Sequence, residues 1–232
     1  IFCEVCVNSW LKIMSTVKHK ITHFIKQTSQ NVKQPLICAF HAVNISSLIY
    51  APRRALPQNR KSVYITGASR GLGYALTKQF IKQNWDVIAL VRDKKAAARL
   101  NELNDGQCIP IISDVTHDYI HDIVTSALQS HKKIDVLINN AGIMSQTKKL
   151  NDKGAEMTFA VNVLGHHLLT KLLVEFLKKA SPSRIINVAS DYAGGLDLDD
   201  INFDKRSYDL TKAYKQSKQA NRMLTREWAR RL

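Results

Sequence analysis

The chain has 232 residues, of which 45% are hydrophobic and 23% are charged, values that are ordinary for a folded domain. Its net charge is +15, from 34 basic and 19 acidic residues, and residues 1–61 contain nine of the basic residues and a single acid. The sequence contains none of the common DNA-binding signatures, such as a Cys₂His₂ pattern. The positive charge therefore suits a nucleotide ligand better than a nucleic acid.

Four cysteines are unevenly distributed along the chain. Cys3, Cys6 and Cys38 precede residue 61, and only Cys108 follows it. This distribution does not support a disulfide framework and fits a reducing, intracellular compartment. Cys3-x-x-Cys6 is half of a zinc or redox motif without a second half, so we interpret it as a chance pair.

The composition changes near residue 60, which divides the chain into an N-terminal extension (1–60) and a domain (61–232). Residues 10–28 place apolar side chains on one face and basic side chains on the opposite face at helical spacing, which predicts a basic amphipathic helix. Such a helix suits a membrane surface or a mitochondrial transit peptide, and a solvated tail is an equal alternative. Residues 36–51 form an apolar stretch that is shorter than the roughly 20 residues needed to span a bilayer, so we do not predict a transmembrane helix there. Because the first methionine is Met14, we expect a fragment or an over-extended translation of residues 1–13.

From Ser62 onward, short apolar runs alternate with helical patterns, as in βαβ units. The patterns predict strands over Ser62–Thr66, Asp86–Val91, Cys108–Ser113, Ile134–Asn139 and Arg184–Val188. They predict helices over Leu72–Asn84, Lys94–Leu103, His117–Ser130, Glu156–Lys179 and from Lys212 to the end. Continuous apolar strands are typical of parallel sheets covered by helices. The predicted fold class is therefore α/β, with an open, doubly wound parallel sheet.

A glycine-rich turn, Thr66–Gly73, follows the first predicted strand and opens the first helix. Glycine is needed where the backbone turns tightly or approaches a pyrophosphate, because a Cβ would block the approach. The helix N-terminus then presents free N–H groups to the phosphates. The turn predicts a dinucleotide site, and an ordinary strand-to-helix turn is the alternative.

Four further motifs follow the turn in chain order. They are Asp114 after the third strand, Asn139-Asn140-Ala141-Gly142, Asn162 and Ser190. A last motif, Tyr214-x-x-Ser217-Lys218, follows them. Together with the turn, this series resembles the short-chain dehydrogenase/reductase family over Ser62–Leu232. The sequences around Asn162 and Tyr214, and the 24-residue separation of Ser190 from Tyr214, resemble the branch that contains retinol dehydrogenases.

The resemblance implies an NAD(P)-binding Rossmann fold and hydride transfer between a nicotinamide cofactor and a carbonyl or alcohol. The expected substrate is a lipophilic, retinoid-like aldehyde, ketone or alcohol. The catalytic residues it implies are Asn162, Ser190, Tyr214 and Lys218. The cofactor-binding residues it implies are Gly67, Ser69, Arg70, Gly71, Leu72, Gly73, Arg92, Asp114, Val115, Asn140, Ala141, Gly142, Tyr214 and Lys218. Many members of the family pair through the long helix and the Tyr-Lys helix, so a homodimer is an expectation.

The chemistry explains these residue types. Tyr214 and Lys218 are four apart and share one helix face. A phenol in water has a pKa of about 10, and a neighbouring ammonium favours the phenolate. As in the family, Lys218 would hold the nicotinamide ribose, Ser190 would bond the substrate oxygen, and Asn162 would hold a proton-relaying water. Tyr208 and Lys212 also fit Y-x-x-x-K, but Tyr208 follows a polar stretch and is predicted to lie in a loop.

Cofactor preference depends on the end of the second strand, where Arg92 and Asp93 stand side by side. An acid there suits the ribose of NAD, whereas an arginine suits the 2′-phosphate of NADP. Arg70 adds a second positive charge, so we predict NADP(H), interpret Asp93 as a helix cap, and keep NAD(H) as the alternative. The pair His166-His167 has no third ligand nearby in the sequence. We interpret it as packing and surface, and we predict no metal site.

The family continues past the Tyr-Lys helix with further elements, so we expect an incomplete domain with an exposed sheet edge. Two other functions stay open. One is an inactive, truncated member that serves as a nucleotide-binding or regulatory module. The other, based on the extension alone, is a basic protein that binds membranes or nucleic acid.

Overall fold

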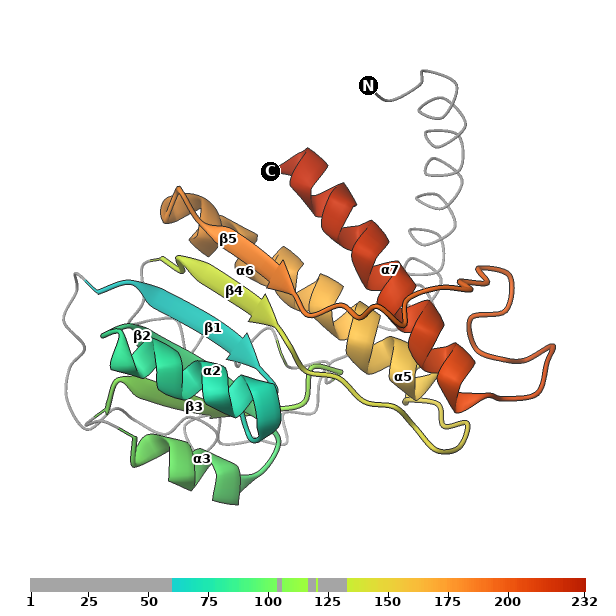
Figure 1. Ribbon diagram of the computed structural model, residues 1–232, viewed down its shortest axis with the longest axis horizontal. Coiled ribbons are helices and arrows are strands. Elements are labelled where there is room, and N and C mark those ends of the chain that lie inside the picture. The colour runs from blue at the N-terminus through green and yellow to red at the C-terminus, as the bar shows by residue number, and fades with distance from the viewer. Residues whose placement is uncertain (1–59, 104–105, 117–119, 121–132) are drawn as a thin grey trace, which may run out of the picture.

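The computed structural model describes residues 60–103, 106–116, 120 and 133–232. Their five strands form one parallel sheet in the order β3-β2-β1-β4-β5 (Figure 1). The strands are β1 (Ser62–Thr66), β2 (Asp86–Val91), β3 (Cys108–Ile112), β4 (Val136–Asn139) and β5 (Arg184–Asn187). The helices are α2 (Gly71–Lys82), α3 (Lys94–Asn101), α5 (Met157–Phe159), the π-helical turn η3 (Ala160–Gly165), α6 (His166–Lys179) and α7 (Leu210–Arg231).

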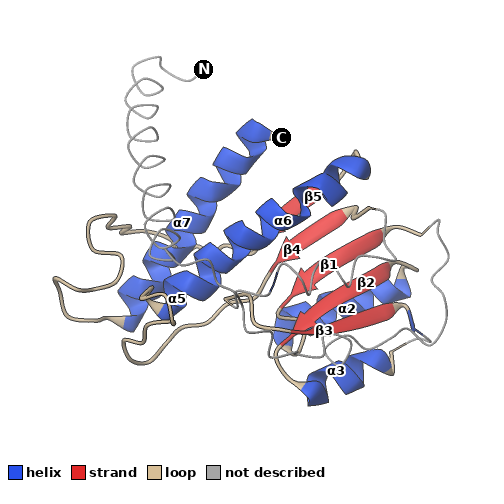
Figure 2. Ribbon diagram, turned by 180° about the vertical axis from the view of Figure 1, so that it is seen from behind, coloured by secondary structure: helices blue, strands red, loops and turns tan. Residues whose placement is uncertain are grey.

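Helices cover both faces of the sheet (Figures 1 and 2). Successive strand residues point to opposite faces, so β2 supplies two cores. Val87 and Ala89 pack with α2 and α3, whereas Ile88 and Leu90 pack with α6. Burial on both sides explains the continuous apolar strands and confirms the doubly wound α/β prediction.

The strand order reverses at β1. From β1 the chain moves outward through β2 to β3, and it then returns to β4, which pairs with the other side of β1. In open α/β sheets, ligands bind beyond the carboxyl ends of the strands at this reversal. The fold therefore places a crevice beside the glycine-rich turn.

The predicted helix over Glu156–Lys179 has the expected extent, but it is not one regular helix. The Glu156 carboxylate accepts hydrogen bonds from the amides of Thr158 and Phe159, and η3 then separates α5 from α6. Met157–Lys179 is also the one stretch among the described residues that is long and apolar enough to cross a membrane. Its apolar residues Leu169 and Leu173 pack against the sheet, so burial in the core accounts for its composition.

Helix caps explain where other elements begin. Asp93 accepts a hydrogen bond from the Ala96 amide at 2.7 Å, which confirms that it caps α3. Asp209 accepts from the Lys212 amide at 2.8 Å, and α7 therefore begins at Leu210, two residues before the predicted start. The bounds of β1 and β2 are as predicted, and the other described strand and helix ends differ from the predictions by two residues at most, as frayed ends commonly do. The amphipathic segment over 10–28 and the helix expected over 117–130 lie outside the described residues.

β5 differs from the other strands because its residues are exposed or half-buried. It pairs with β4 on one side, and Ile186 is 43% exposed. Among the described residues, no strand covers its second side, in agreement with the expected open edge.

Gly165, the last residue of η3, tests how tightly this turn is packed. A Cβ on Gly165 would lie 2.7 Å from Val115 Cγ2, whereas a Cβ on Gly194 would meet nothing within 4 Å. Overpacking costs about 1–3 kcal/mol. We expect Gly165→Ala to lower the free energy of unfolding in urea by that amount, and Gly194→Ala to leave it nearly unchanged. Equal stabilities for the two variants would contradict the contact.

Candidate active site

A crevice of about 260 Å³ opens at the carboxyl ends of β1, β2, β3 and β4. It is lined by every predicted cofactor-binding residue from Gly67 to Gly142, and Tyr214 and Lys218 are not among its lining residues. Five further residues, which the sequence analysis did not predict, also line it: Leu90, Val91, Ser113, Ile143 and Val161. Each of them stands within one or two residues of a predicted site residue, and Val161 is next to Asn162, so their place in the sequence was a signal.

The glycine-rich turn has a steric reason for its glycines. Gly67 and Gly71 have φ of +67° and +54°, in the region that glycine adopts without strain. A Cβ on Gly73 would lie 2.3 Å from the Gly67 carbonyl oxygen and 2.7 Å from Asn140 Nδ2. No side chain caps the N-terminus of α2, and its first turn has no acid. Its N–H groups can therefore receive an anionic ligand.

Thr66 joins the turn to the segment after β4. Its Oγ1 accepts hydrogen bonds from the amides of Asn140 and Ala141, both at 2.9 Å. Asn140 Nδ2 donates to the Thr66 carbonyl at 2.9 Å and to the Gly67 carbonyl at 3.3 Å. We call these four bonds the Thr66–Asn140 clasp. Thr66 is the first residue of the predicted turn, but the sequence indicated no role for it beyond a hydroxyl at the end of a buried strand.

His166 supports the same segment from α6. It is 2% exposed, and its Nε2 lies 2.7 Å from the Ala141 carbonyl oxygen, so Nε2 carries the proton and donates. Burial lowers the pKa of His166 to about 4. The imidazole is therefore neutral near pH 7. This agrees with its interpretation as a packing residue and adds a contact to the Asn140–Gly142 segment that the sequence did not predict.

The four predicted catalytic residues come from η3, the segment after β5, and α7. Asn162 is fully buried, and its Nδ2 donates to the Ile143 carbonyl and to Ser217 Oγ, each at 3.0 Å. Its Oδ1 accepts from the Ile143 amide at 2.9 Å, which leaves one acceptor site for the predicted water. Asn162 thus links the segment after β4 to α7.

Lys218 lies beside Tyr214 and near the crevice. Its Nζ is 5.5 Å from the centre of the Tyr214 ring and donates to the Val188 carbonyl at 2.8 Å. Burial lowers the pKa of Lys218. A Cβ on Gly142 would lie 3.8 Å from this Nζ and 3.5 Å from Asn162 Oδ1, so the crevice and the catalytic residues adjoin at Gly142.

Ser190 and Tyr214 keep reactive groups accessible. The half-buried Ser190 accepts a hydrogen bond from the Tyr192 amide at 3.1 Å, and its hydroxyl hydrogen is available to donate. The segment after Ser190 reaches α7, where the Gly194 amide donates to the Lys215 carbonyl. Among the described residues, no hydrogen-bond partner meets the Tyr214 hydroxyl.

Tyr208, the competing tyrosine, lies in a loop as predicted. Its hydroxyl donates to the Ser145 carbonyl at 3.0 Å and to Glu156 Oε1 at 3.3 Å. Burial and, to a smaller extent, the Glu156 carboxylate raise the pKa of Tyr208. Its proton is therefore held by the protein rather than offered to a ligand.

Three arginines lie at or near the end of the crevice beside β2. Arg70 and Arg92 line it and are exposed. Arg99, which the sequence analysis missed, donates to the Ser69 carbonyl and stacks on the Tyr74 ring, 4.6 Å from its centroid. The crevice thus has a positive rim at the end of β2.

The profile of the short chain dehydrogenase family matches residues 61–232. Human retinol dehydrogenase 13 is 36% identical over 181 residues, which are 74% of this chain and 54% of that protein. Human retinol dehydrogenase 14 is 38% identical over 193 residues, covering 74% of this chain and 57% of that protein. A crystal structure of a Mycobacterium paratuberculosis protein, 32% identical, superposes with a TM-score of 0.64 over 79% of this chain and 66% of that one.

The chain therefore belongs to the short-chain dehydrogenase family, an α/β family that uses nicotinamide dinucleotides. Its relatives place it in the branch that resembles retinol dehydrogenases. The chain spans about half the length of the curated relatives it matches.

His166 predicts a pH dependence of stability. Its pKa is lower in the folded chain than the ordinary 6.5, so the unfolded chain binds more protons between about pH 4 and 6.5. Its contribution to stability is complete above that range and is lost as the pH falls through it. Between pH 7 and pH 5 we expect the wild type to lose about 2 kcal/mol more unfolding free energy than His166→Gln, which keeps a donor without titrating. Urea titrations measure both losses, and equal losses would refute the assignment.

Proposed function

We propose that the protein is an NADP(H)-dependent oxidoreductase that interconverts a carbonyl and an alcohol, with residues 61–232 as its cofactor-binding and catalytic domain. One observation carries the proposal. The glycine-rich turn, two exposed arginines and Asn140–Gly142 line a single crevice, and Gly142 adjoins Lys218 and Asn162. Membership of the family gives the reaction class.

The residues present fit a dinucleotide. The uncapped N-terminus of α2 offers N–H groups to a pyrophosphate, and a side chain at Gly73 would collide with the Gly67 carbonyl and Asn140. Asp114, whose carboxylate already holds the Thr116 amide and hydroxyl, stands at the end of β3 to face an adenine. When bound, the nicotinamide supplies the hydride.

The chain's own residues supply binding and proton transfer. In the reducing direction, the Tyr214 hydroxyl gives its proton to the carbonyl oxygen as the carbon receives hydride, and the product is an alcohol. Lys218 stabilises the resulting phenolate and uses its two remaining N–H donors for ribose hydroxyls. Ser190 donates a hydrogen bond to the same substrate oxygen. In the oxidising direction the alcohol would give its proton to the Tyr214 phenolate as its carbon loses hydride, and the product would be a carbonyl.

The substrate class follows from the relatives. Two of them are named retinol dehydrogenases, so a retinoid-like or other lipophilic alcohol, aldehyde or ketone is the proposed substrate. We also propose that residues 1–60 contact a membrane surface and that two copies of the chain pair.

Tyr214→Phe tests the catalytic assignment. General acid–base catalysis contributes about 10²- to 10⁴-fold, so kcat should fall by at least about 100-fold. The NADPH dissociation constant should rise by no more than about ten-fold, the effect of one lost hydrogen bond. Tyr208→Phe is the matched control and should keep most of the activity. A larger loss in Tyr208→Phe would reverse the assignment of the two tyrosines. If wild-type chain binds NADPH but turns over none of a panel of retinoid and simple carbonyls, a nucleotide-binding module becomes the better description.

Arg92→Gln tests the cofactor assignment. A hydrogen bond to a charged group contributes about 1.5–3 kcal/mol, so NADPH affinity should fall by about ten- to a hundred-fold while NADH affinity is unchanged. Fluorescence titration with each nucleotide measures both affinities. Lys82→Gln is the control, because Lys82 lies at the C-terminal end of α2, away from the glycine-rich turn, and this variant should change neither affinity. Equal weakening of both nucleotides would show that Arg92 does not face a 2′-phosphate.

A further inference from the structure

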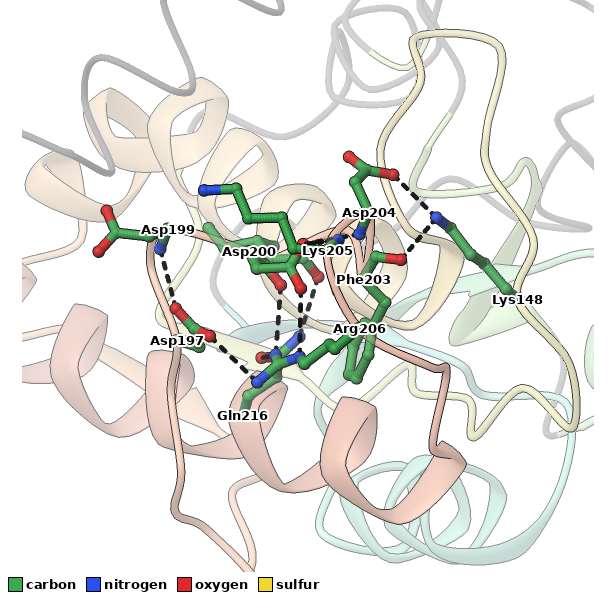
Figure 3. A network of polar contacts seen from close by, with 10 residues as sticks. Lys148, Asp197, Asp199, Asp200, Phe203, Asp204, Lys205, Arg206 and Gln216 are labelled. Atoms are coloured by element: carbon green, nitrogen blue, oxygen red, sulfur yellow. Dashed lines mark hydrogen bonds and ion pairs between the residues drawn. The ribbon is translucent and has the colours of Figure 1, made fainter.

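A charged cluster joins the loop before α7 to the buried side of that helix (Figure 3). We define the Arg206 cluster as Arg206, Asp197, Asp200, Phe203 and Gln216. The Arg206 guanidinium pairs with Asp197 Oδ2 at 3.1 Å and with Asp200 Oδ2 at 3.4 Å. It also donates to the Asp200 carbonyl at 3.2 Å and to Gln216 Oε1 at 3.1 Å, and it stacks on Phe203, 4.4 Å from the ring centroid.

Gln216 is the part of the cluster that belongs to α7. It is fully buried, and both ends of its amide are used, because its Nε2 donates to the Ile201 carbonyl at 3.0 Å. Gln216 lies midway between Tyr214 and Lys218 in the sequence. Each of its bonds therefore fixes the short stretch of helix that carries the proposed catalytic pair.

The loop that holds Arg206 is itself anchored. Ile201 is buried in an apolar cluster with Phe159 and Val163. Phe203 is also buried, and Lys148 Nζ donates to its carbonyl at 2.8 Å. Asp200 is 6% exposed and accepts from the amides of Asp204 and Lys205. Although burial opposes it, these amides and the charge of Arg206 hold the pKa of Asp200 below its ordinary value. Arg206 thus faces a fixed carboxylate rather than a mobile one.

The opposite side of the same helical turns is held by different partners. Ser217 Oγ accepts a hydrogen bond from Asn162 at 3.0 Å, and Lys218 donates to the Val188 carbonyl. The Arg206 cluster adds polar bonds from the loop side, so the turns that carry Tyr214 and Lys218 are held from two directions. A helix that loses the bonds on one side can rotate or shift along its axis, and misplacement by about 1 Å can cost about a hundred-fold in rate.

We infer that Arg206 is a positioning residue, which acts through Gln216 to set the axial position and rotation of α7 and so aims Tyr214 and Lys218 at the crevice. Arg206 touches neither of them. The catalytic part of this inference rests on the proposed function, whereas the mechanical part does not. A guanidinium suits the task because its planar donors reach a carboxylate, a carbonyl and an amide at once while its face stacks on a ring.

The test compares Arg206→Gln with Arg230→Gln by backbone hydrogen exchange and steady-state kinetics. Arg230 is the matched control, an exposed arginine near the far end of α7 whose one ion-pair partner among the described residues is Glu227 on its own helix. In Arg206→Gln we expect exchange over residues 210–218 to quicken at least ten-fold, while residues 222–231 and β1 change less than two-fold. We expect kcat to fall at least ten-fold with NADPH affinity and KM within two-fold. Arg230→Gln should change neither.

Two further variants separate positioning from simple stability. Arg206→Lys keeps the charge but not the planar donors and should recover part of the lost kcat. Asp197→Asn removes one partly exposed ion pair, so it provides a test should Arg206→Gln fail to fold. It should give the same changes in exchange and kcat, with smaller size. Faster exchange at every element, a lower melting temperature and an unchanged kcat per folded molecule would overturn the inference, as would unchanged exchange over 210–218.

The outcomes also separate the two proposals. A wild-type chain without turnover defeats the proposed function, and the exchange pattern over 210–218 then decides the mechanical inference by itself. A fully active Arg206→Gln with wild-type exchange defeats the positioning role and leaves the proposed function intact.

Discussion

The Thr66–Asn140 clasp is the constraint on which the crevice depends. It joins the carboxyl ends of β1 and β4 at the point where the strand order reverses. A parallel sheet leaves backbone groups just beyond these ends without partners in the sheet, and the single Thr66 hydroxyl accepts hydrogen bonds from two of the amides there. The clasp brings the glycine-rich turn against Asn140–Gly142, and His166 supports that segment from the other side through the Ala141 carbonyl. A ligand therefore meets a preformed wall rather than two independent loops.

The side of the site that holds the proposed catalytic residues is organised around α7 in a comparable way. Asn162 ties it to the segment after β4, Lys218 ties it to the segment after β5, and Gln216 ties it to the loop that carries Arg206. The π-helical turn that contains Asn162 interrupts an otherwise regular helix, and such turns often occur at functional sites. Because these partners lie far apart in the sequence, the geometry of Tyr214 is a property of the whole domain.

Charge is used differently in the two halves of the site. Arg70 and Arg92 are exposed at the rim, where they are free to receive an anion. Arg206 is partly buried and already neutralised by Asp197 and Asp200, so its charge holds structure. The distinction follows from the partners, because a guanidinium that already contacts two carboxylates and two carbonyl-type oxygens has little capacity left for a ligand.

The sequence by itself determined the class of fold, the order of the strands and helices, and the motifs of the candidate site. Apolar runs and glycine spacing are local signals that predicted the strands, the helices and the glycine-rich turn, whereas the resemblance to the short-chain dehydrogenase/reductase family implied the cofactor-binding residues from Gly67 to Gly142. The π-helical turn, Thr66, His166 and Arg206 came only from the tertiary structure. Their roles depend on partners that lie up to 75 residues distant in the chain, and no local pattern specifies which hydroxyl, imidazole or guanidinium will meet which carbonyl. Periodicity determines which face of an element is buried, whereas folding alone decides what each buried polar group touches.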